Sequence, residues 1–378
     1  MAHILNFEFQ DVKDILAEAG LKPFKAKQLW DWVHVKGVLD IDRMLNISKA
    51  DKAIMTQLFE FDALDISSQQ NATDGVIKWL FKLHDGHEVE SVFIPEEGRG
   101  TLCISSQVGC TLNCRFCHTG TQGLSRNLTA AEIVAQVHKA RSVIEDWNGR
   151  GEKRNVTNIV FMGMGEPLYN YDNVKKGCQI LMCDHGQGFG TRKITISTSG
   201  VVDHIADISE SLGVNLAVSI HSANDETRTK IMPVNKKYNL ESLIGALKEF
   251  KFKEKRRIFW EYSPLKGVND SVQDAHDLCD LIEGIPSKVN LIPYNQWPGS
   301  PFEPATDKAL NKFYKTMQER GVLTTIRKTR GEDILAACGQ LRSETSKINT
   351  VSVEFPEAVL QYGTDRQKEK VKVNIDKE

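Results

Sequence analysis

Long apolar runs are missing from this sequence of 378 residues. The longest of them, such as residues 158–164, are far shorter than the ~20 residues that a membrane-spanning helix needs. The first residues, MAHILNFEF, also lack the basic region, apolar core and small-residue cleavage site of an export signal. We therefore expect a cytoplasmic protein that has no association with a membrane.

A strong excess of charge is missing as well. The formal net charge is −2, so the whole molecule has no electrostatic attraction for nucleic acid, although a local basic face stays possible. Tandem repeats and low-complexity arrays are also absent. Hydrophobic residues make up 40% and charged residues 26% of the chain, which is ordinary for a globular protein. The length allows one large domain together with a smaller one.

Cysteine, in contrast, is plentiful. Thiols stay reduced in the cytoplasm, so clustered cysteines there indicate metal or redox chemistry more than a disulfide framework. Three of the eight fall within the stretch QVGCTLNCRFCHTG, and three others lie in helical patterns that suggest ordinary buried thiols. The clustered ones are Cys110, Cys114 and Cys117; those in helical patterns are Cys178, Cys183 and Cys279; Cys103 and Cys338 stand apart.

The order of hydrophobic patterns predicts an α/β fold. Residues 1 to about 70 show helical spacing, and residues 75–95 read as strands with a hairpin turn at Asp85–Gly86. From Thr101 onward, short strands alternate with helices, which predicts a parallel sheet in a barrel or an incomplete barrel. The expected strands lie in TLCISSQ, NIVFMGMGEP, KITISTSG, NLAVSIHS, RIFWEYSPL, KVNLIPYN and LTTIRKT. The chemistry of such folds lies at the carboxyl ends of the strands, where the motifs below occur.

The clustered cysteines have the spacing C-x3-C-x2-C. A structural zinc site would need a fourth ligand, which the adjacent His118 is poorly placed to supply and a distant cysteine could provide. The alternative is a [4Fe–4S] cluster, in which three protein thiolates leave one iron with an open coordination position. An open position is typical of a reactive metal site, and the placement after the first barrel strand favours the cluster.

This spacing resembles the signature of radical S-adenosylmethionine (SAM) enzymes. The resemblance implies that SAM chelates the fourth iron through its amino and carboxylate groups, and that an electron from the cluster cleaves SAM to a 5′-deoxyadenosyl radical. In the turn MGMGEP, glycines allow close backbone approach and Glu166 can accept hydrogen bonds from an ammonium group. By itself, the MGMGEP turn is a weak signal that a plain βα turn would also give, and each of the other candidates is more often a strand-end residue with local hydrogen bonds. The residues expected to bind SAM are Gly165, Glu166, Ser197, Ser219, Ile220, His221 and Asn295.

Several motifs in order resemble the RlmN/Cfr family of radical-SAM RNA methyltransferases, and the resemblance extends to about residue 345. The motifs are TLCISSQVGCTLNCRFCHTG, RNLTAAEI, MGMGEPL, SIHS and IRKTRGEDILAACGQL. The resemblance implies a partial (β/α)6 radical-SAM barrel over residues 101–345, preceded by an RNA-binding helical domain over residues 1–70 and a β extension over residues 71–100. Residues 346–378 are expected to form a charged tail that is solvated or mobile.

The resemblance also implies how two further cysteines and a glutamate act. Cys338 takes a methyl group from one SAM, a radical from a second SAM removes hydrogen from it, and the product adds to an adenine carbon. Glu90 accepts the proton of that carbon, and Cys103 attacks the Cys338 sulfur, which releases methyladenine and leaves a disulfide. From the residues alone, both cysteines could be small buried thiols, and Glu90 one strand glutamate among many.

Arg126–Asn127 and the loop Trp297–Pro304 resemble the RlmN branch, which methylates C2 of adenine, rather than the Cfr branch, which methylates C8. The implied substrates are 23S rRNA at the peptidyl transferase centre and, next to the anticodon, tRNA. An electron donor such as a flavodoxin-type reductant is the implied partner, and we expect a monomer.

Two stretches that mix basic and aromatic residues, FKAKQLWDW and KEFKFKEKRR, are equally typical of RNA contacts and of solvated helix faces. Three alternatives stay open. They are a C8 methyltransferase of 23S rRNA, a different radical-SAM enzyme, and a zinc-containing protein that binds RNA without catalysis.

Overall fold

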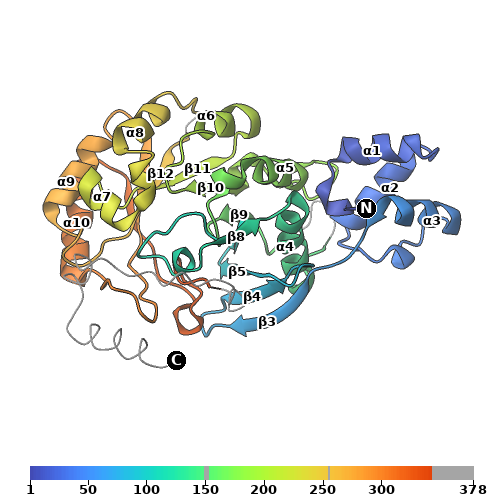
Figure 1. The fold of residues 1–378 in the computed structure, drawn as a ribbon, viewed down its shortest axis with the longest axis horizontal. Coiled ribbons are helices and arrows are strands. Elements are labelled where there is room, and N and C mark those ends of the chain that lie inside the picture. Colours follow the sequence, from blue (N-terminus) through green and yellow to red (C-terminus); the bar gives the residue numbers. More distant parts are fainter. Residues whose placement is uncertain (149–152, 254–255, 343–378) are drawn as a thin grey trace.

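The computed structural model describes residues 1–148, 153–253 and 256–342. Its first part is a small helical region that lies to one side of the remaining chain in Figure 1. The helices are α1 (Phe9–Glu18), α2 (Phe24–His34) and α3 (Lys49–Leu58), and the short strands β1 (Ala2–His3) and β2 (Phe59–Glu60) pair in parallel beside them. Helix α3 begins after Ser48, whose side chain accepts the backbone N–H of Asp51.

The helical region ends earlier than the sequence pattern indicates. Helical spacing predicts helices to about residue 70, but α3 ends at Leu58, and strand β3 (Asp65–Asn71) follows. Most side chains of β3 are exposed, because it is the outermost strand of the large sheet. An exposed edge strand needs no apolar face, so the polar sequence DISSQQN gives no alternation that would indicate a strand.

The large sheet has ten strands, in the order β14-β13-β12-β11-β10-β9-β6-β5-β4-β3. At one edge, β3, β4 (Ile77–Lys82) and β5 (Glu88–Glu96) are antiparallel, and the predicted turn at Asp85–Gly86 is confirmed because it joins β4 to β5. The other seven strands run parallel. They are β6 (Arg99–Cys103), β9 (Asn158–Phe161), β10 (Ile194–Thr198), β11 (Asn215–Ser219), β12 (Ile258–Tyr262), β13 (Ser287–Leu291) and β14 (Thr324–Ile326).

The parallel strands and the helices between them form the predicted partial barrel. Strands β14 and β3 are the two ends of the sheet, so within the described residues the barrel does not close. Figure 1 shows the helices on the outer side of the sheet. They are α4 (Ala130–Val143), α5 (Tyr171–Met182), α6 (Ile205–Asp207), α7 (Asp225–Ile231), α8 (Leu240–Lys248), α9 (Val272–Leu281) and α10 (Asp307–Glu319).

Local sequence signals set where several of these helices begin. Thr129 with Glu132 and Ser271 with Asp274 form capping boxes at the starts of α4 and α9, which satisfy backbone N–H groups that a helix start leaves unpaired. Within the described residues, no helix is long and apolar enough to cross a membrane. The expected tail of residues 346–378 lies outside the described residues.

Candidate active site

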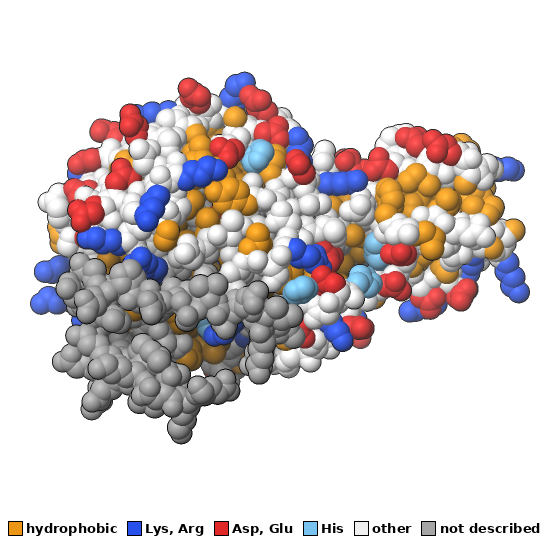
Figure 2. Space-filling view, viewed as in Figure 1, with side chains coloured by type: hydrophobic (Ala, Val, Ile, Leu, Met, Phe, Trp, Pro, Cys, Tyr) orange, Lys and Arg blue, Asp and Glu red, His pale blue; other side chains and the backbone are white. Residues whose placement is uncertain are grey.

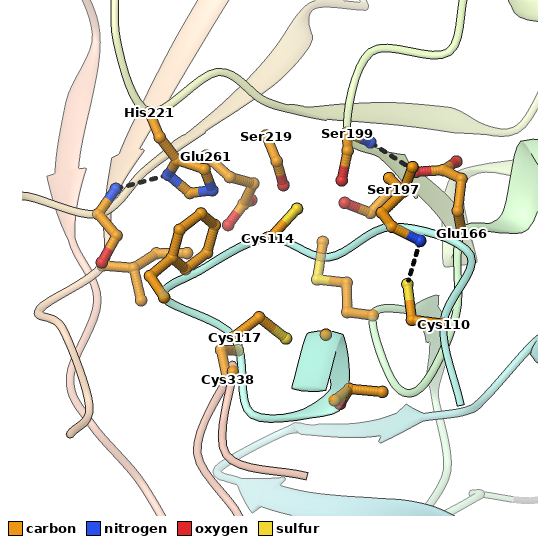
Figure 3. A pocket seen from close by; sticks show the side chains of 18 of the residues that line it. Cys110, Cys114, Cys117, Glu166, Ser197, Ser199, Ser219, His221, Glu261 and Cys338 are labelled. Carbon is orange, nitrogen blue, oxygen red and sulfur yellow. Dashed lines mark hydrogen bonds between the residues drawn. The ribbon is translucent and has the colours of Figure 1, made fainter. Parts of the chain in front are cut away.

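A cysteine loop, residues 110–123, connects the two strands of a small antiparallel hairpin, β7 (Gln107–Gly109) and β8 (Leu124–Asn127). The loop is compact, because the N–H of Cys117 donates to the carbonyl of Cys114 at 3.0 Å and the N–H of Gly120 donates to that of Cys117 at 3.1 Å. Figure 3 shows the side chains of Cys110, Cys114 and Cys117 around one pocket. The three cysteines line the same pocket, and their role as ligands of one metal cluster stays a prediction.

The three buried thiols would be stabilised as thiolates by a bound group of several cations. Burial is the main cause that raises the pKa of each, to about 12 for Cys114, and mutual repulsion adds to the shifts of Cys110 and Cys114. Bound cations would offset both effects. Among the described residues, no three His, Cys, Asp or Glu side chains lie close enough to hold a single metal ion. Three thiols that line one pocket have the chemistry of iron–sulfur ligands, and the described residues provide no group of three ligands for a single zinc ion.

The pocket opens at the carboxyl ends of the parallel strands, as the fold predicts. Residues that follow β9, β10, β11, β12 and β13 line it together with the cysteine loop. The space that protein atoms leave empty there is about 970 Å³, which includes space open to solvent. The lining combines sulfur, hydroxyl, carboxylate and aromatic groups, so it can hold a ligand with a charged head and an apolar body.

Glu166 is held rigidly beside the cysteines. Its Oε2 accepts the backbone N–H of Ser199 at 2.8 Å, and its Oε1 accepts that of Leu168 at 3.0 Å. The preceding Gly165 has a φ of 99°, and a Cβ there would lie 2.5 Å from the Cβ of Gln107. Only glycine fits that conformation and that close approach. The MGMGEP turn thus fixes a carboxylate in the pocket, where it can accept hydrogen bonds from an ammonium group.

His221 occupies the opposite side of the pocket in Figure 3. Its Nδ1 accepts the backbone N–H of Ser263 at 2.9 Å, so the ring proton lies on Nε2. Burial, with repulsion from Arg228, lowers the pKa of His221 to about 3. The imidazole is therefore neutral and can donate one hydrogen bond from Nε2. Ser197 and Ser219 also line this pocket, as the sequence predicts.

Two of the residues expected to bind SAM lie elsewhere. The side chain of Ile220 is fully buried in the hydrophobic core and does not line the pocket. Asn295 lines a neighbouring cavity inside the barrel, where its Nδ2 lies 3.5 Å from the carbonyl oxygen of Cys338. Their direct contact with SAM stays a prediction, and the geometry instead links Asn295 to the segment that carries Cys338.

Cys338 lies where the pocket and the inner cavity meet, because it lines both. Cys103, at the end of β6, lines only the inner cavity. Burial, reinforced by repulsion from Cys338, raises the pKa of Cys103 to about 12, and Cys338 also contributes to the raised pKa of Cys117. The sulfur of Cys338 is thus within electrostatic reach of a thiol on each side.

Glu90 lines neither of the two cavities that meet at Cys338. Its Oε1 accepts from the Nζ of Lys78 at 3.1 Å, and its Oε2 accepts the backbone N–H of Arg342 at 2.6 Å. Burial raises its pKa, although Lys78 opposes the shift. A carboxylate with a raised pKa suits proton transfer, but in this geometry its oxygens already have partners.

Sequence reasoning missed several polar residues at the junction. Glu261 lines both cavities at the end of β12, and its Oε1 accepts from the Nδ2 of Asn290 at 3.0 Å. Ser199 lines the pocket as well and follows the predicted Ser197 in the STSG motif. The only available signal was position, since each of these residues is at or just after the carboxyl end of a strand.

The structure gives no clear support for RNA contact by FKAKQLWDW or KEFKFKEKRR. In α2 the Nζ of Lys27 pairs with Asp31 at 2.8 Å, Lys25 pairs with Asp51 at 2.8 Å, and Trp30 is buried. Two residues of KEFKFKEKRR, 254 and 255, lie outside the described residues. Figure 2 shows positive and negative side chains interspersed over the visible face. RNA contact by either stretch stays a prediction.

Comparisons with known proteins agree with this fold and pocket. The family model of the radical SAM superfamily matches residues 104–279, and the model of the ribosomal RNA large subunit methyltransferase N-terminal domain matches residues 2–61. A solved radical SAM methyltransferase from Sphaerobacter thermophilus superposes with a TM-score of 0.85 and 38% identity, over 90% of this chain and 99% of that one. The fold and the three-cysteine pocket thus define a radical SAM enzyme, a class that uses a [4Fe–4S] cluster and SAM.

Named relatives show to which family within the radical SAM class this chain belongs. The dual-specificity RNA methyltransferase RlmN of Paracoccus denitrificans is 48% identical over 354 residues, which cover 91% of this chain and 90% of the relative. The protein of the same name in Rhodospirillum rubrum is 49% identical, over 91% of this chain and 81% of the relative. This chain belongs to the RlmN family of radical-SAM RNA methyltransferases.

Proposed function

We propose that this protein methylates C2 of adenine in 23S rRNA, at the peptidyl transferase centre, and in tRNA next to the anticodon. The relatives described above are named as dual-specificity RNA methyltransferases, which supports two RNA substrates. The observation that carries the proposal is the position of Cys338, whose side chain lines both the cysteine pocket and the inner cavity that holds Cys103.

The target carbon explains why such a position is needed. C2 of adenine is electron-poor and a bad nucleophile, so it cannot take a methyl group from SAM by direct displacement. Cys110, Cys114 and Cys117 would hold the cluster, and Glu166 and His221 would orient SAM beside it. A cluster bound by these three cysteines would supply the electron that cleaves SAM to a 5′-deoxyadenosyl radical. A sulfur at the boundary of both cavities can carry a methyl group from that pocket to an adenine in the inner cavity.

The remaining residues would complete the transfer. Cys338 first takes the methyl group by nucleophilic displacement on one SAM, and after hydrogen removal the methylene radical joins sulfur to the adenine carbon. The adduct then carries one unpaired electron, which a bound cluster would take back. Glu90, which lines neither cavity, would accept the proton of that adenine carbon through a water molecule. The Cys103 sulfur then attacks the Cys338 sulfur, so a disulfide forms and the carbon–sulfur bond breaks with its electron pair on the methylene carbon. That carbon takes up a proton and becomes the methyl group. An external electron donor, such as a flavodoxin-type reductant, returns both residues to thiols.

The proposal also covers the oligomeric state, the cellular compartment and the role of the N-terminal helices. A monomer in the cytoplasm would suit an enzyme whose RNA substrates and reductant are there, and reduced thiols require such a compartment. The helical region that precedes the barrel would bind RNA, as the match to a ribosomal RNA methyltransferase N-terminal domain supports.

Anaerobic turnover with SAM, a reductant and a fragment of 23S rRNA tests the proposal. Separation of the nucleosides after digestion should reveal methyladenosine substituted at C2, and the Cys117→Ala variant should give none. A product substituted at C8 would contradict the branch that we assign. A tRNA with an adenine beside the anticodon should also be methylated, and failure on that RNA would limit the activity to rRNA.

A further inference from the structure

The segment that carries Cys338 is held by hydrogen bonds to a turn of the sheet that is far away in the sequence. We call residues 327–342 the Cys338 loop and residues 72–76, between β3 and β4, the β3–β4 turn. The Nε of Arg330 donates to Oδ2 of Asp74 at 2.7 Å, and its Nη2 donates to the Asp74 carbonyl oxygen at 2.7 Å. The backbone N–H of Gly331 reaches the same Oδ2 at 3.1 Å. In return, Asp333 accepts the backbone N–H of Thr73 at 2.9 Å.

These contacts are shielded and depend on a close approach of backbones. The side chains of Asp74 and Arg330 are 34% and 21% exposed, so the pair is partly withdrawn from water and its hydrogen bonds are charge-assisted. Gly331 has a φ of 65°, and a Cβ there would lie 2.9 Å from the Cγ1 of Val76. Any side chain at this position would press on Val76 of the β3–β4 turn and on Ala336 of the Cys338 loop.

The Cys338 loop is also strained, which makes such fastening necessary. Leu335 has a φ of 51°, in the left-handed region that a branched apolar residue avoids, and its side chain is 39% exposed. A backbone of this kind persists only where surrounding contacts hold it. Leu335 lies three residues before Cys338, so release of the strain would move the sulfur.

Lys78 contacts both the Cys338 loop and Glu90, the expected proton acceptor. The Nζ of Lys78, on β4, lies 3.4 Å from the carbonyl oxygen of Leu335 and 3.1 Å from Oε1 of Glu90. The antiparallel strands therefore touch the Cys338 loop at the β3–β4 turn and again at Lys78. A movement of the Cys338 loop at its contact with Asp74 would displace both Cys338 and Glu90.

We propose that Asp74 and Arg330 are positioning residues that hold the sulfur of Cys338 at the boundary of the two cavities. The antiparallel extension is then part of the catalytic apparatus, although it contributes no group that lines the cysteine pocket. The inference rests on the proposed function for what Cys338 does, and on the contacts above for where Cys338 is held.

The test compares the anaerobically prepared, cluster-containing protein with three variants, Asp74→Asn, Gly331→Ala and Asp280→Asn. Asp74→Asn removes the charge of the fastening, and Gly331→Ala removes the close approach without changing any charge. Asp280→Asn is the matched control, because Asp280 pairs with Arg320 between α9 and α10 at 2.5 Å, outside both cavities. Hydrogen exchange of the Cys338 loop, iron content, and kcat and KM for an rRNA fragment are measured for each.

For Asp74→Asn and Gly331→Ala we expect amide exchange in the Cys338 loop to become about 10-fold faster. Their kcat should fall about 10- to 100-fold while KM and iron content stay within about 2-fold, because the sulfur is misplaced and RNA binding is not. Asp280→Asn should match the unmodified protein. Wild-type exchange and kcat in both variants would overturn the inference. If the unmodified protein methylates no RNA, the proposed function fails, and the exchange data still decide whether the fastening exists.

Discussion

Nη1 of Arg327 lies 3.9 Å from Sγ of Cys338, and the same nitrogen lies 3.8 Å from Oε2 of Glu261. Attraction from Cys338 is the main cause that raises the pKa of Arg327, so the guanidinium is charged beside the sulfur. Oε1 of Glu261 accepts from Asn290, which in turn accepts the hydroxyl of Thr325. A partly buried polar network therefore fixes one cation next to the thiol that we expect to carry the methyl group.

Replacement of Arg327 by Met should slow the first methyl transfer to Cys338. The sulfur of Cys338 attacks the methyl group of SAM, and the guanidinium of Arg327, 3.9 Å away, can stabilise the attacking sulfur electrostatically. We expect methylation of Cys338 to be about 10-fold slower, in line with the loss of one charge-assisted contact. Mass analysis of the Cys338 peptide over a time course with SAM measures this rate. Arg320→Met is a suitable control, and an unchanged rate in Arg327→Met would show that the guanidinium has no such role.

The Cys103→Ala variant should stall after carbon–sulfur bond formation. Without the second thiol, nothing attacks the Cys338 sulfur, and the protein stays covalently joined to its RNA. A denaturing gel with labelled RNA should show a slowly migrating species that depends on SAM. Cys183 lies at the end of α5, outside both cavities, so Cys183→Ala should turn over normally. Release of free methylated RNA by Cys103→Ala would remove the role assigned to Cys103.

The Glu166→Gln variant should lose affinity for SAM. Both carboxylate oxygens of Glu166 accept backbone N–H groups, and an amide can offer only one acceptor oxygen. The neutral side chain also attracts an ammonium group less strongly, so we expect binding about 10-fold weaker or worse. Equilibrium binding of SAM to the cluster-containing variant is the measurement, with iron content as the control. Full affinity with a normal cluster would place the amino group of SAM elsewhere.

Buried histidines should make the fold sensitive to acid. Among the described residues, neither ring nitrogen of His34 has a hydrogen-bond partner. The residue is fully buried, and burial is the main cause that lowers its pKa to about 3. The unfolded chain, with a His pKa of about 6.5, binds the proton more readily. Stability is therefore complete above that pH and falls as the pH drops towards 3.

Between pH 7 and pH 5, His34 alone should remove about 2 kcal/mol from the free energy of unfolding. A His34→Phe variant should lose less stability over this interval in chemical unfolding. The exposed His84 provides the control His84→Gln, which should behave like the unmodified protein. Equal pH dependence in His34→Phe and the unmodified protein would exclude His34 as a source of the acid sensitivity.

The sequence predicts well what depends on local patterns. The alternation of strands and helices after Thr101 predicts the parallel barrel, and the cysteine spacing and the MGMGEP turn predict two groups of residues that line the pocket. Both signals work because hydrophobic period and turn chemistry are properties of a few neighbouring residues.

Contacts between distant segments could not be predicted in the same way. Nothing in the residues around Asp74 indicates that Arg330 lies 2.7 Å away, and nothing around Glu90 indicates Lys78 as its partner. Ile220 follows a strand as the other SAM candidates do, yet the next residue, His221, has a φ of 52°. The chain turns there, and the Ile220 side chain lies in the core while His221 lines the pocket.

The account rests most on Cys338 as the carrier of the methyl group, and the mass of the Cys338 peptide tests that claim most directly. The protein, with its cluster, is treated with SAM and reductant without oxygen, then digested and analysed before RNA is added. We predict that Cys338 gains one methyl group and that this group disappears from the peptide when RNA is methylated. Methylated RNA from a protein whose Cys338 is never modified would contradict the account.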